Sequence, residues 1–371
     1  MTKHLVLIGG GHAHMETLAK LHTFVEKGYR VTVVGPSAYH YYSGMGPGML
    51  GKTYTPEDIR FATQHVVEKQ GGTFILGKAV GVDPNAKTLS LESGGQIAYD
   101  VISFNAGSYV PLLNLPEMTG DIYSAKPIER LLEAQKRILE LCSQKKVTIG
   151  IVGGGPSSAE IAGNVWQLTR DSQLISPEIK ILAGKRFMSR FPEKVRTKVK
   201  KSLMQHGISI LPGGYVDTIE SKTIVMASGE RHDLDIIFLA LGVRPNQLFK
   251  KSGLPTGPDG GLLVNKYLQC TTHPDIFGGG DCIYFESQPL DKVGVYAVRE
   301  NPILYANLMA ALEGKPLQPF DPGGDYLLIF NMGGGKGVLQ KKWLLLDGKL
   351  AFFIKDAIDR KFMKEFQALE I

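Results

Sequence analysis

Two glycine-rich turns have the composition and the surroundings of phosphate-binding sites. The triplets Gly9–Gly11 and Gly153–Gly155 each follow an apolar run, at 5–8 and 147–152, and each precedes a helical pattern. A parallel strand that enters a helix through glycines points backbone N–H groups and the positive end of the helix at an anion. We therefore predict that the first and third glycine of each triplet bind the pyrophosphate of a dinucleotide. One such turn alone would be weak support, because glycine turns are also purely structural.

The residue that should bind the adenosine ribose is missing from both units. An Asp or Glu normally ends the second strand of a dinucleotide-binding unit. In the first unit Ser37 stands close to this position, so Ser37 or backbone amides would have to bind the ribose. In the second unit Gly184 is followed by Lys185 and Arg186, and basic residues without an acid suit the 2′-phosphate of NADPH. The same two residues could equally be a solvated surface pair.

A third pair of matching segments indicates that the two units are copies of one domain layout. Segment 100–107 parallels 235–242, because each is an apolar strand that starts at an Asp and ends at a Gly. Short β-rich stretches at 73–91 and 208–228 precede these segments. Strand, glycine turn, helix and strand thus recur in the same order. We predict an α/β fold with two Rossmann-like domains of three layers, ββα.

The rest of the chain gives a third segment and a tail. The third segment contains the glycines Gly278–Gly280 followed by Asp281, and then a long helix over 293–312. The tail pattern predicts strands at 326–331, 342–346 and 350–353 and a helix from Ile354, and so a small α+β segment. One apolar stripe on this helix comprises Ile354, Ile358, Phe362, Phe366 and Leu369. No role for the triplet Gly333–Gly335 follows from the sequence.

Composition excludes several classes of protein. The chain has 371 residues, of which 44 are glycine, and a net charge of +6 from scattered basic residues, so no nucleic-acid partner is expected. No apolar run reaches the ~18 residues of a membrane-spanning helix. Cys142, Cys270 and Cys282 lack C-x-x-C spacing, and the nine histidines lack metal-ligand spacing. We therefore expect no redox dithiol, no metal and a reducing, cytoplasmic location.

Together these motifs resemble those of the FAD/NAD(P)-dependent pyridine nucleotide-disulfide oxidoreductase superfamily. Within it, the chain is similar to type II NADH:quinone dehydrogenases and to the flavoprotein fused to selenophosphate synthetase. The segments 43–49, 294–299 and 354–363 carry this narrower likeness. The resemblance implies that FAD is the cofactor and that NADH or NADPH is the co-substrate. It also implies that Gly280 and Asp281 end the second FAD motif, in which the Asp binds a ribityl hydroxyl.

The resemblance also assigns roles to single residues. A Glu at the position of Glu160 reaches the nicotinamide and the flavin in related dehydrogenases, and Lys292 would place a positive charge at the flavin pyrimidine edge. These two are the predicted catalytic residues, although each could instead be an ordinary surface residue. Besides the glycine turns, Ser37 and Asp281, the predicted cofactor-binding residues are His12, Gly44, Pro47, Val80, Asn105, Ala106, Gly107, Gly242, Gly280 and Val293.

The resemblance implies a division of the chain into three parts. Residues 1–125 and 245–320 would form a discontinuous FAD-binding domain, 126–244 an NAD(P)-binding domain, and 321–371 a C-terminal segment. In type II dehydrogenases this last region binds the membrane surface and guides quinone. The charges of the final helix nearly balance here, whereas a membrane-surface helix should be distinctly basic. Packing on the body or on a second subunit in a homodimer is therefore equally open.

The implied function is hydride transfer from NAD(P)H to FAD, followed by electron transfer to a small-molecule acceptor. A quinone is the leading choice of acceptor, and a quinone reductase would work in the cytoplasm, at the inner face of the membrane. Two alternatives stay open. One is a soluble flavin reductase in selenium or sulfur metabolism, and the other is a regulator that binds flavin or nucleotide without turnover.

Overall fold

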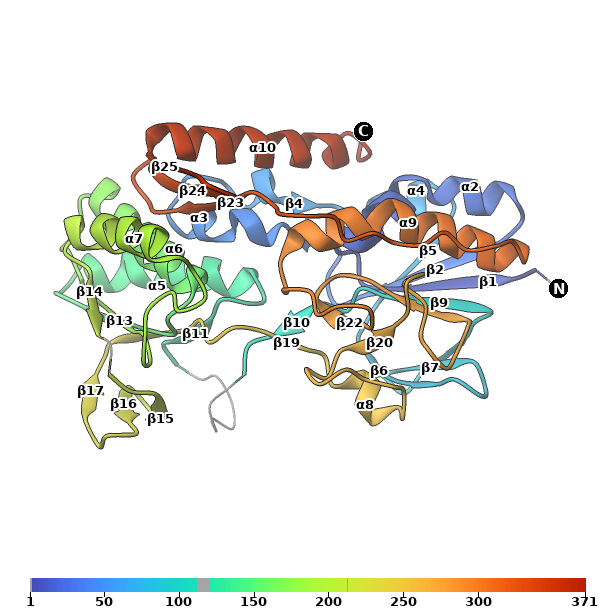
Figure 1. Cartoon of the computed structure of the whole chain (residues 1–371), viewed down its shortest axis with the longest axis horizontal. Coiled ribbons are helices and arrows are strands. Elements are labelled where there is room, and N and C mark those ends of the chain that lie inside the picture. The colour runs from blue at the N-terminus through green and yellow to red at the C-terminus, as the bar shows by residue number, and fades with distance from the viewer. Residues whose placement is uncertain (1, 112–119, 212) are drawn as a thin grey trace.

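Two five-stranded parallel sheets form the centres of the two halves of the protein (Figure 1). The structure is a computed structural model that describes residues 2–111, 120–211 and 213–371. The first sheet contains, in spatial order, β21 (Ile276–Gly278), β9 (Val101–Phe104), β1 (His4–Ile8), β2 (Arg30–Gly35) and β5 (Thr73–Leu76). The second contains β11 (Ile122–Ser124), β18 (Ile236–Leu239), β12 (Thr148–Val152), β13 (Glu178–Leu182) and β14 (Ser209–Leu211). The matching orders confirm the predicted duplication.

Each half has three layers, as the sequence predicts. Helices cover one face of each parallel sheet and a small antiparallel sheet lies on the other side (Figure 1). The helices of the first half are α1 (Met15–Ala19), α2 (Leu21–Glu26), α4 (Thr63–Lys69) and α9 (Gly294–Glu313). Those of the second half are α5 (Glu129–Cys142), α6 (Pro156–Asp171) and α7 (Glu193–Gln205). The antiparallel sheets are β6 (Ala79–Asp83), β7 (Thr88–Leu91) and β8 (Gln96–Ala98), and β15 (Val216–Glu220), β16 (Thr223–Met226) and β17 (Arg231–Asp233).

The chain crosses between the two halves at a short antiparallel ribbon. β10 (Ser108–Tyr109) leaves the first sheet and β19 (Arg244–Pro245) returns from the second. Ser108 pairs with Pro245 and Tyr109 pairs with Arg244. This pairing holds the two connections between the halves side by side, next to Asp281 of the second predicted FAD motif.

The helix that the sequence predicts after the first glycine turn is interrupted at Lys20. The His14 side chain is fully buried, with Nδ1 donating to the Gly9 carbonyl oxygen at 2.7 Å and Nε2 at 2.8 Å from Ser103 Oγ. The chain forms a 3-10 turn at His12–His14 and then the two short helices α1 and α2.

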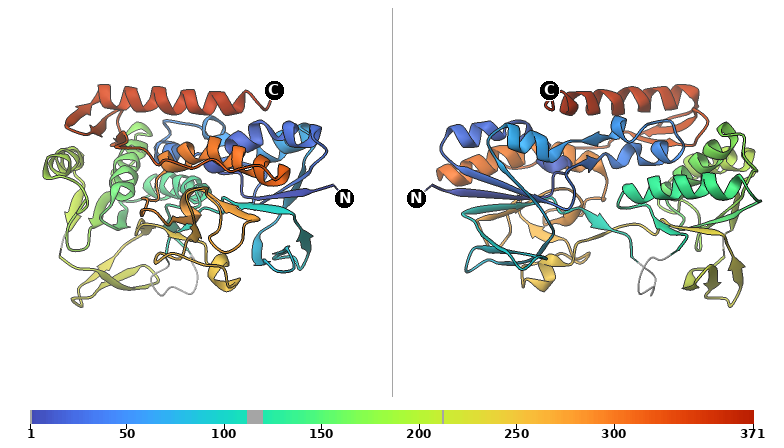
Figure 2. Two further views of the ribbon diagram at one scale, coloured as in Figure 1. Left: turned by 45° about the vertical axis from the view of Figure 1, so that its right-hand side comes forward. Right: turned by 180° about the vertical axis from the view of Figure 1, so that it is seen from behind.

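The C-terminal segment differs from its prediction in two respects. Its sheet consists of β23 (Leu328–Asn331), β24 (Gly337–Lys341) and β25 (Leu344–Gly348), so the strand expected at 350–353 is wrong. That stretch begins α10 (Lys349–Gln367), which runs along one side of the molecule in every view (Figures 1 and 2). The buried positions of α10 are Ala351, Lys355, Asp359 and Met363. Of the predicted apolar stripe, Phe362, Phe366 and Leu369 pack on the first core, whereas Ile358 is 48% exposed.

The triplet Gly333–Gly335 attaches this segment to the second half. All three glycines have positive φ, and the Gly333 and Gly334 amides donate to the Asn331 and Gln167 side chains at 3.0 and 2.7 Å. A Cβ atom at Gly163 on α6 would lie 2.2 Å from the Met332 carbonyl oxygen. Helix and hairpin thus meet backbone to backbone, which explains the glycines that the sequence left without a role.

The substitution Gly163→Ala tests this contact. Alanine normally favours a helix interior over glycine by about 1 kcal/mol. Here the clash with Met332 should outweigh that gain and lower the stability by about 1–3 kcal/mol. We expect a lower Tm and faster proteolysis of the C-terminal segment, whereas Gly77→Ala, which has open space around the new Cβ, should change neither. A Gly163→Ala variant with unchanged Tm and protease resistance would contradict the close contact.

Candidate functional site

Asn105 lies at the centre of the first glycine turn. A Cβ atom at Gly9, which has φ +85°, would lie 2.3 Å from the Asn105 carbonyl oxygen. Cβ atoms at Gly11 and Gly280 would lie 2.8 and 2.9 Å from the Nδ2 and Oδ1 atoms of the same residue. Three predicted cofactor-binding glycines from the first turn and the second motif therefore surround one predicted cofactor-binding Asn. Any side chain at Gly9 would clash with the Asn105 carbonyl oxygen and so prevent this close packing.

Several buried polar atoms near this turn have no hydrogen-bond partner among the described residues. They are His12 Nε2, His40 Nε2, Thr63 Oγ1 and Asn105 Nδ2. Thr63 packs on Gly10, and the His12 and His40 ring centroids are 5.4 Å apart. Buried polar groups are nearly always satisfied in folded proteins. The residues present therefore fit a polar, anionic group such as the pyrophosphate and ribityl chain of FAD.

Asp281 is held as a carboxylate. Its Oδ2 atom accepts hydrogen bonds from Lys126 Nζ at 2.7 Å and from Ser108 Oγ at 2.8 Å. Burial opposes the charge, but the Lys126 ammonium and the Ser108 hydroxyl hold the pKa of Asp281 below its ordinary value. A charged carboxylate can accept the hydroxyl hydrogen bond that the second FAD motif requires.

Lys126 is the cation that contacts Asp281. Lys292 Nζ forms an ion pair with Asp259 at 2.9 Å and donates to the Ile283 carbonyl oxygen. Val293 is the residue before the first turn of α9. Sequence reasoning missed Lys126 because a lone lysine between a short strand and a proline carries no local signal.

The second glycine turn leaves open space in front of its helix. Cβ atoms at Gly153 and Gly154 would lie 2.2 and 2.4 Å from the Ala240 and Ala183 carbonyl oxygens. Nothing lies within 4 Å of a Cβ at Gly155, the N-cap of α6, or at Gly242. The turn is closed toward its own sheet and open at the helix N-terminus, as an anion site requires.

Glu160 takes part in the attachment of the C-terminal segment. Its Oε1 atom accepts a hydrogen bond from the Asn331 amide at 2.8 Å. Burial raises the pKa of Glu160 to about 7, and the charges of Lys355 and Asp359 act on it in opposite directions. A carboxyl that titrates near neutral pH can donate or accept a proton under working conditions.

α10 places a buried ion pair beside the Gly44 loop. Lys355 Nζ lies 2.6 Å from Asp359 Oδ2 and donates to the Gly44 carbonyl oxygen at 2.7 Å. The Tyr42 hydroxyl donates to Asp359 Oδ1 at 3.0 Å. The sequence gives no signal for a role of Lys355 and Asp359, since an i,i+4 pair of opposite charges usually lies on a helix surface.

The other predicted residues are less closely connected. Pro47 is buried in the first turn of α3 (Gly46–Leu50), and Ala106 and Gly107 directly follow Asn105. Val80, on β6, is 45% exposed. Ser37 Oγ accepts a hydrogen bond from the Tyr39 amide at 3.2 Å. The described contacts of Ser37 and Val80 do not join them to the group around Asn105.

The three cysteines are separate and buried. Cys142, Cys270 and Cys282 are all free thiols in the described part of the chain. Burial raises the pKa of Cys142 to about 11 and that of Cys282 to about 12. Thiols of this kind are poor nucleophiles and poor redox groups.

Comparison with known proteins gives the family. A family model described as pyridine nucleotide-disulphide oxidoreductase matches residues 3–302. The chain belongs to this family. It is accordingly an FAD-dependent oxidoreductase with NADH or NADPH as co-substrate, as the sequence predicts.

Individual relatives match this oxidoreductase over most of its length. It is 25% identical to ferroptosis suppressor protein 1 of Taeniopygia guttata, with 91% of this chain and 88% of that protein covered. It is 23% identical to the type II NADH:quinone oxidoreductase of Staphylococcus saprophyticus, with 97% and 94% covered.

Solved structures share the fold. The sulfide:quinone oxidoreductase of Aquifex aeolicus superimposes with a TM-score of 0.82 at 18% identity, covering 99% of this chain and 92% of that one. NDH2 of Plasmodium falciparum, solved in complex with NADH, gives a TM-score of 0.76 at 15% identity, with 99% and 100% covered.

Glu300 offers a pH test of the second motif. This buried residue accepts a hydrogen bond from the Gly280 amide, and burial raises its pKa from an ordinary value of 4.5 to about 7. Its contribution to stability is complete below pH 4.5 and is lost as pH rises to about 7, on the order of 3 kcal/mol. The Tm of Glu300→Gln, relative to that of the wild type at the same pH, should therefore increase as pH rises from 5 to 8.

A second glutamate on α9 gives the opposite sign as a control. Ion pairing with Lys27 and Lys315 lowers the pKa of Glu313 to about 2. Above pH 4.5, Glu313→Gln should therefore have a lower Tm than the wild type in the same thermal melts. Parallel Tm–pH curves for Glu300→Gln and the wild type would contradict a neutral, buried Glu300.

Proposed function

We propose that the protein is an NAD(P)H:quinone oxidoreductase. Hydride passes from the nicotinamide to FAD, and electrons then pass directly to a quinone. The observation that carries this proposal is the match, over 97% of this chain, to a type II NADH:quinone oxidoreductase; the three cysteines are buried free thiols. The names of relatives support a quinone acceptor, since a type II NADH:quinone oxidoreductase and a sulfide:quinone oxidoreductase are among them.

The proposal gives each part of the chain a task. Residues 1–125 and 245–320 bind FAD, 126–244 bind the nicotinamide nucleotide, and 321–371 border the acceptor site. Gly9, Gly11, Asn105 and Asp281 bind FAD, and the turn at Gly153–Gly155 binds NAD(P)H. Bound FAD supplies the two-electron chemistry, while the residues of the chain position and orient the reactants.

The nucleotide site favours NADPH on chemical grounds. Ala183 and Gly184 follow β13 where a ribose-binding acid would stand, and Lys185 and Arg186 next to them are exposed. An engineered NADPH oxidase, in which an Asp is replaced by Ala and two positions become Arg, was solved bound to NADPH. The same combination of a missing acid and added positive charge is present in this chain.

The experiment that tests the function is anaerobic reduction of the purified protein. We expect a bound-flavin absorption band that NADPH, and less efficiently NADH, bleaches and that a soluble quinone restores. Lys185→Ala with Arg186→Ala should raise the KM for NADPH about tenfold and leave that for NADH unchanged. Arg231→Ala, an exposed arginine paired with Glu220, is the matched control.

The other outcomes separate the alternatives. A protein without bound flavin would overturn the proposal entirely. Flavin that neither nucleotide bleaches would favour the regulator. Bleaching that a quinone does not reverse, but a selenium or sulfur compound does, would favour the soluble flavin reductase.

The C-terminal segment also has an exposed apolar surface. Trp343, Leu350, Phe353 and Ile358 are 89%, 60%, 67% and 48% exposed. We name these four residues the C-terminal apolar surface. Lys341, Lys342 and Lys349 lie beside them in the sequence and are exposed.

We propose that this surface rests on the membrane, where aromatic and basic side chains together bind the interface. Among the described residues, no helix is long and apolar enough to cross a bilayer.

Cosedimentation with anionic vesicles tests this contact. Trp343→Ser with Phe353→Ser should lower the bound fraction at least about fivefold, because two large apolar side chains are lost from the interface. Met204→Ser, which removes a 68% exposed side chain of α7, should bind like the wild type. A wild type that stays off vesicles but forms dimers in sedimentation velocity would show that the surface is a subunit interface.

A further inference from the structure

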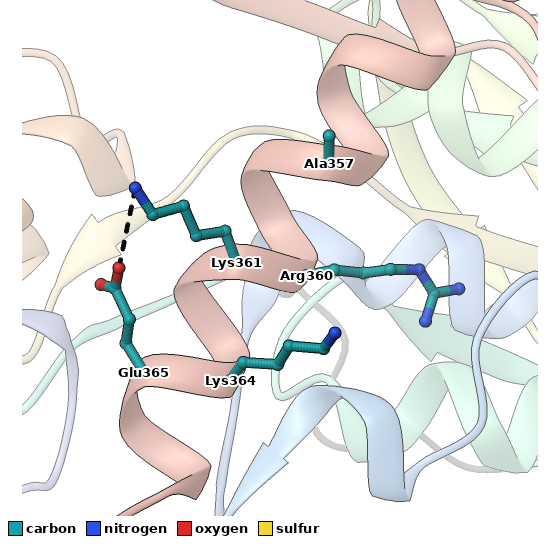
Figure 3. A pocket seen from close by; sticks show the side chains of 5 residues that line it. All are labelled: Ala357, Arg360, Lys361, Lys364 and Glu365. Atoms are coloured by element: carbon teal, nitrogen blue, oxygen red, sulfur yellow. Dashed lines mark ion pairs between the residues drawn. The ribbon is translucent and has the colours of Figure 1, made fainter.

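The ion pair between Lys126 and Asp281 joins the two halves of the protein. Lys126 lies between β11 and α5 of the second half, whereas Asp281 lies in the 3-10 turn Gly280–Cys282 of the first half. Lys126 Nζ is 2.7 Å from Asp281 Oδ2, and the two side chains are 27% and 14% exposed. By contrast, the pair Lys361–Glu365 on α10 is 3.9 Å apart and 79% and 58% exposed (Figure 3). Exposed pairs of the second kind contribute little to stability, so the shielded pair between the halves is the one that can couple them.

The Ser108 hydroxyl ties this pair to the ribbon at which the chain crosses between the halves. It donates to Asp281 Oδ2 at 2.8 Å, and Lys126 Nζ donates to Ser108 Oγ at 3.1 Å. Ser108 belongs to β10, which pairs with β19 at the crossing. We name Lys126, Ser108 and Asp281 the junction triad. A change in the placement of one half relative to the other would break at least one of its hydrogen bonds.

The two oxygen atoms of the Asp281 carboxylate have different environments. Oδ2 accepts both hydrogen bonds of the junction triad, whereas Oδ1 accepts none from any residue that the structure describes. A carboxylate offers about four lone-pair sites. Oδ1 can therefore accept the ribityl hydroxyl of FAD while Oδ2 stays bound to Lys126 and Ser108. One side chain can thus contact the cofactor and the second half at the same time.

The positive charge of Lys126 also reaches the first glycine turn. Burial lowers the pKa of His12 to about 3 and that of His40 to about 4, and the Lys126 ammonium adds to both shifts. Both rings are therefore neutral at the pH of the cell and do not offset the charge of Asp281. The pyrophosphate of FAD is itself anionic, so an Asp281 carboxylate without a neighbouring cation would repel it. Lys126 supplies that cation.

We propose that Lys126 is a positioning residue that couples the binding of FAD to the placement of the second half. It acts through Asp281, whose Oδ2 it holds and whose Oδ1 it leaves to the cofactor. FAD bound at Oδ1 orders the carboxylate, and the ordered carboxylate fixes Lys126 and the segment between β11 and α5. The inference rests on the proposed FAD contact of Asp281 and is independent of the electron acceptor.

Such a coupling serves hydride transfer. The nicotinamide bound by the second half must lie against the flavin bound by the first, and a misplacement of about 1 Å can slow a reaction about a hundredfold. A link through the cofactor site gives the second half its fixed position when FAD is bound. Because coupling between two sites is reciprocal, loss of the link should loosen the second half and weaken FAD binding together.

A double-mutant cycle on FAD affinity tests the link. The Kd follows from the flavin fluorescence released on serial dilution of the FAD-loaded full chain. Lys126→Met keeps the length of the side chain but leaves Asp281 without its cation, so the Kd should rise about tenfold or more. Lys126→Arg keeps the charge and should raise it less than about threefold. In the Asp281→Asn background, Lys126→Met should change the Kd less than about twofold, because no carboxylate remains to be held.

The pH dependence of the Kd is a readout that a merely structural role would not move. Burial favours a neutral Asp281, but the Lys126 ammonium and the Ser108 hydroxyl hold its pKa below the ordinary value of 3.8. Without Lys126, burial should raise this pKa. The FAD affinity of Lys126→Met, relative to that of the wild type at the same pH, should therefore fall as pH rises from about 5 to 8, since Asp281 then becomes charged beside an anion. The other groups that face Asp281 are Lys292, Glu300 and His12, and they are the same in both proteins.

Hydrogen exchange tests the coupling between the halves. Removal of FAD from the wild type should speed amide exchange in segment 122–128 of the second half. In Lys126→Met, exchange there should already be fast with FAD bound. Lys222→Met is the matched control, because Lys222 pairs at 2.9 Å with Asp121, an 11% exposed carboxylate just before β11. This variant and Lys361→Met should bind FAD and exchange like the wild type.

The outcomes separate this inference from the proposed function. If Asp281→Asn leaves the Kd for FAD unchanged, the proposed FAD contact of Asp281 is wrong and the link fails with it. If Asp281→Asn weakens FAD binding but Lys126→Met does not, or does so equally in both backgrounds, the positioning role alone is overturned. Slow exchange of 122–128 in FAD-loaded Lys126→Met would overturn the coupling. Should Lys126→Met fail to fold, Ser108→Ala removes one bond of the triad without a change of charge and should raise the Kd about threefold.

Discussion

At Gly9 and Gly153 the backbone passes so close to the neighbouring strand that a Cβ would lie 2.3 and 2.2 Å from the carbonyl oxygens of Asn105 and Ala240. Because of this close approach, the N-terminus of each following helix points to one place beyond the C-terminal ends of the strands. The unpaired backbone amides of the helix point to the same place. Each sheet has the same strand order. One backbone constraint, used twice, therefore shapes both of the predicted nucleotide sites.

The C-terminal segment contacts both halves of the protein. Its hairpin meets α6 at Gly163, and its helix contributes Lys355 and Asp359 to the loop beside the first turn. Partly buried side chains of α10 pack on the first core and Met363 packs in the second.

Particular elements show how far local patterns reach. The glycine turns and strands were predictable because a tight turn after an apolar run has few alternatives. The interruption at Lys20 between α1 and α2 was not, because the apolar positions continue across it. The start of α10 was mistaken for a strand, since a short apolar run fits both structures. Lys126 was invisible because only the fold brings it to Asp281.

By itself, the sequence determined the duplicated α/β layout and the two glycine turns, and its motifs indicated the family. These features are local: each depends on a few adjacent residues whose conformational freedom or charge is fixed by their type. The tertiary structure alone decided which charges meet. Lys355 and Asp359 look like a surface pair in the sequence, and they became buried because α10 packs that side on the Gly44 loop. Burial and long-range contact, which no local pattern encodes, set the acidity of the groups that surround the site.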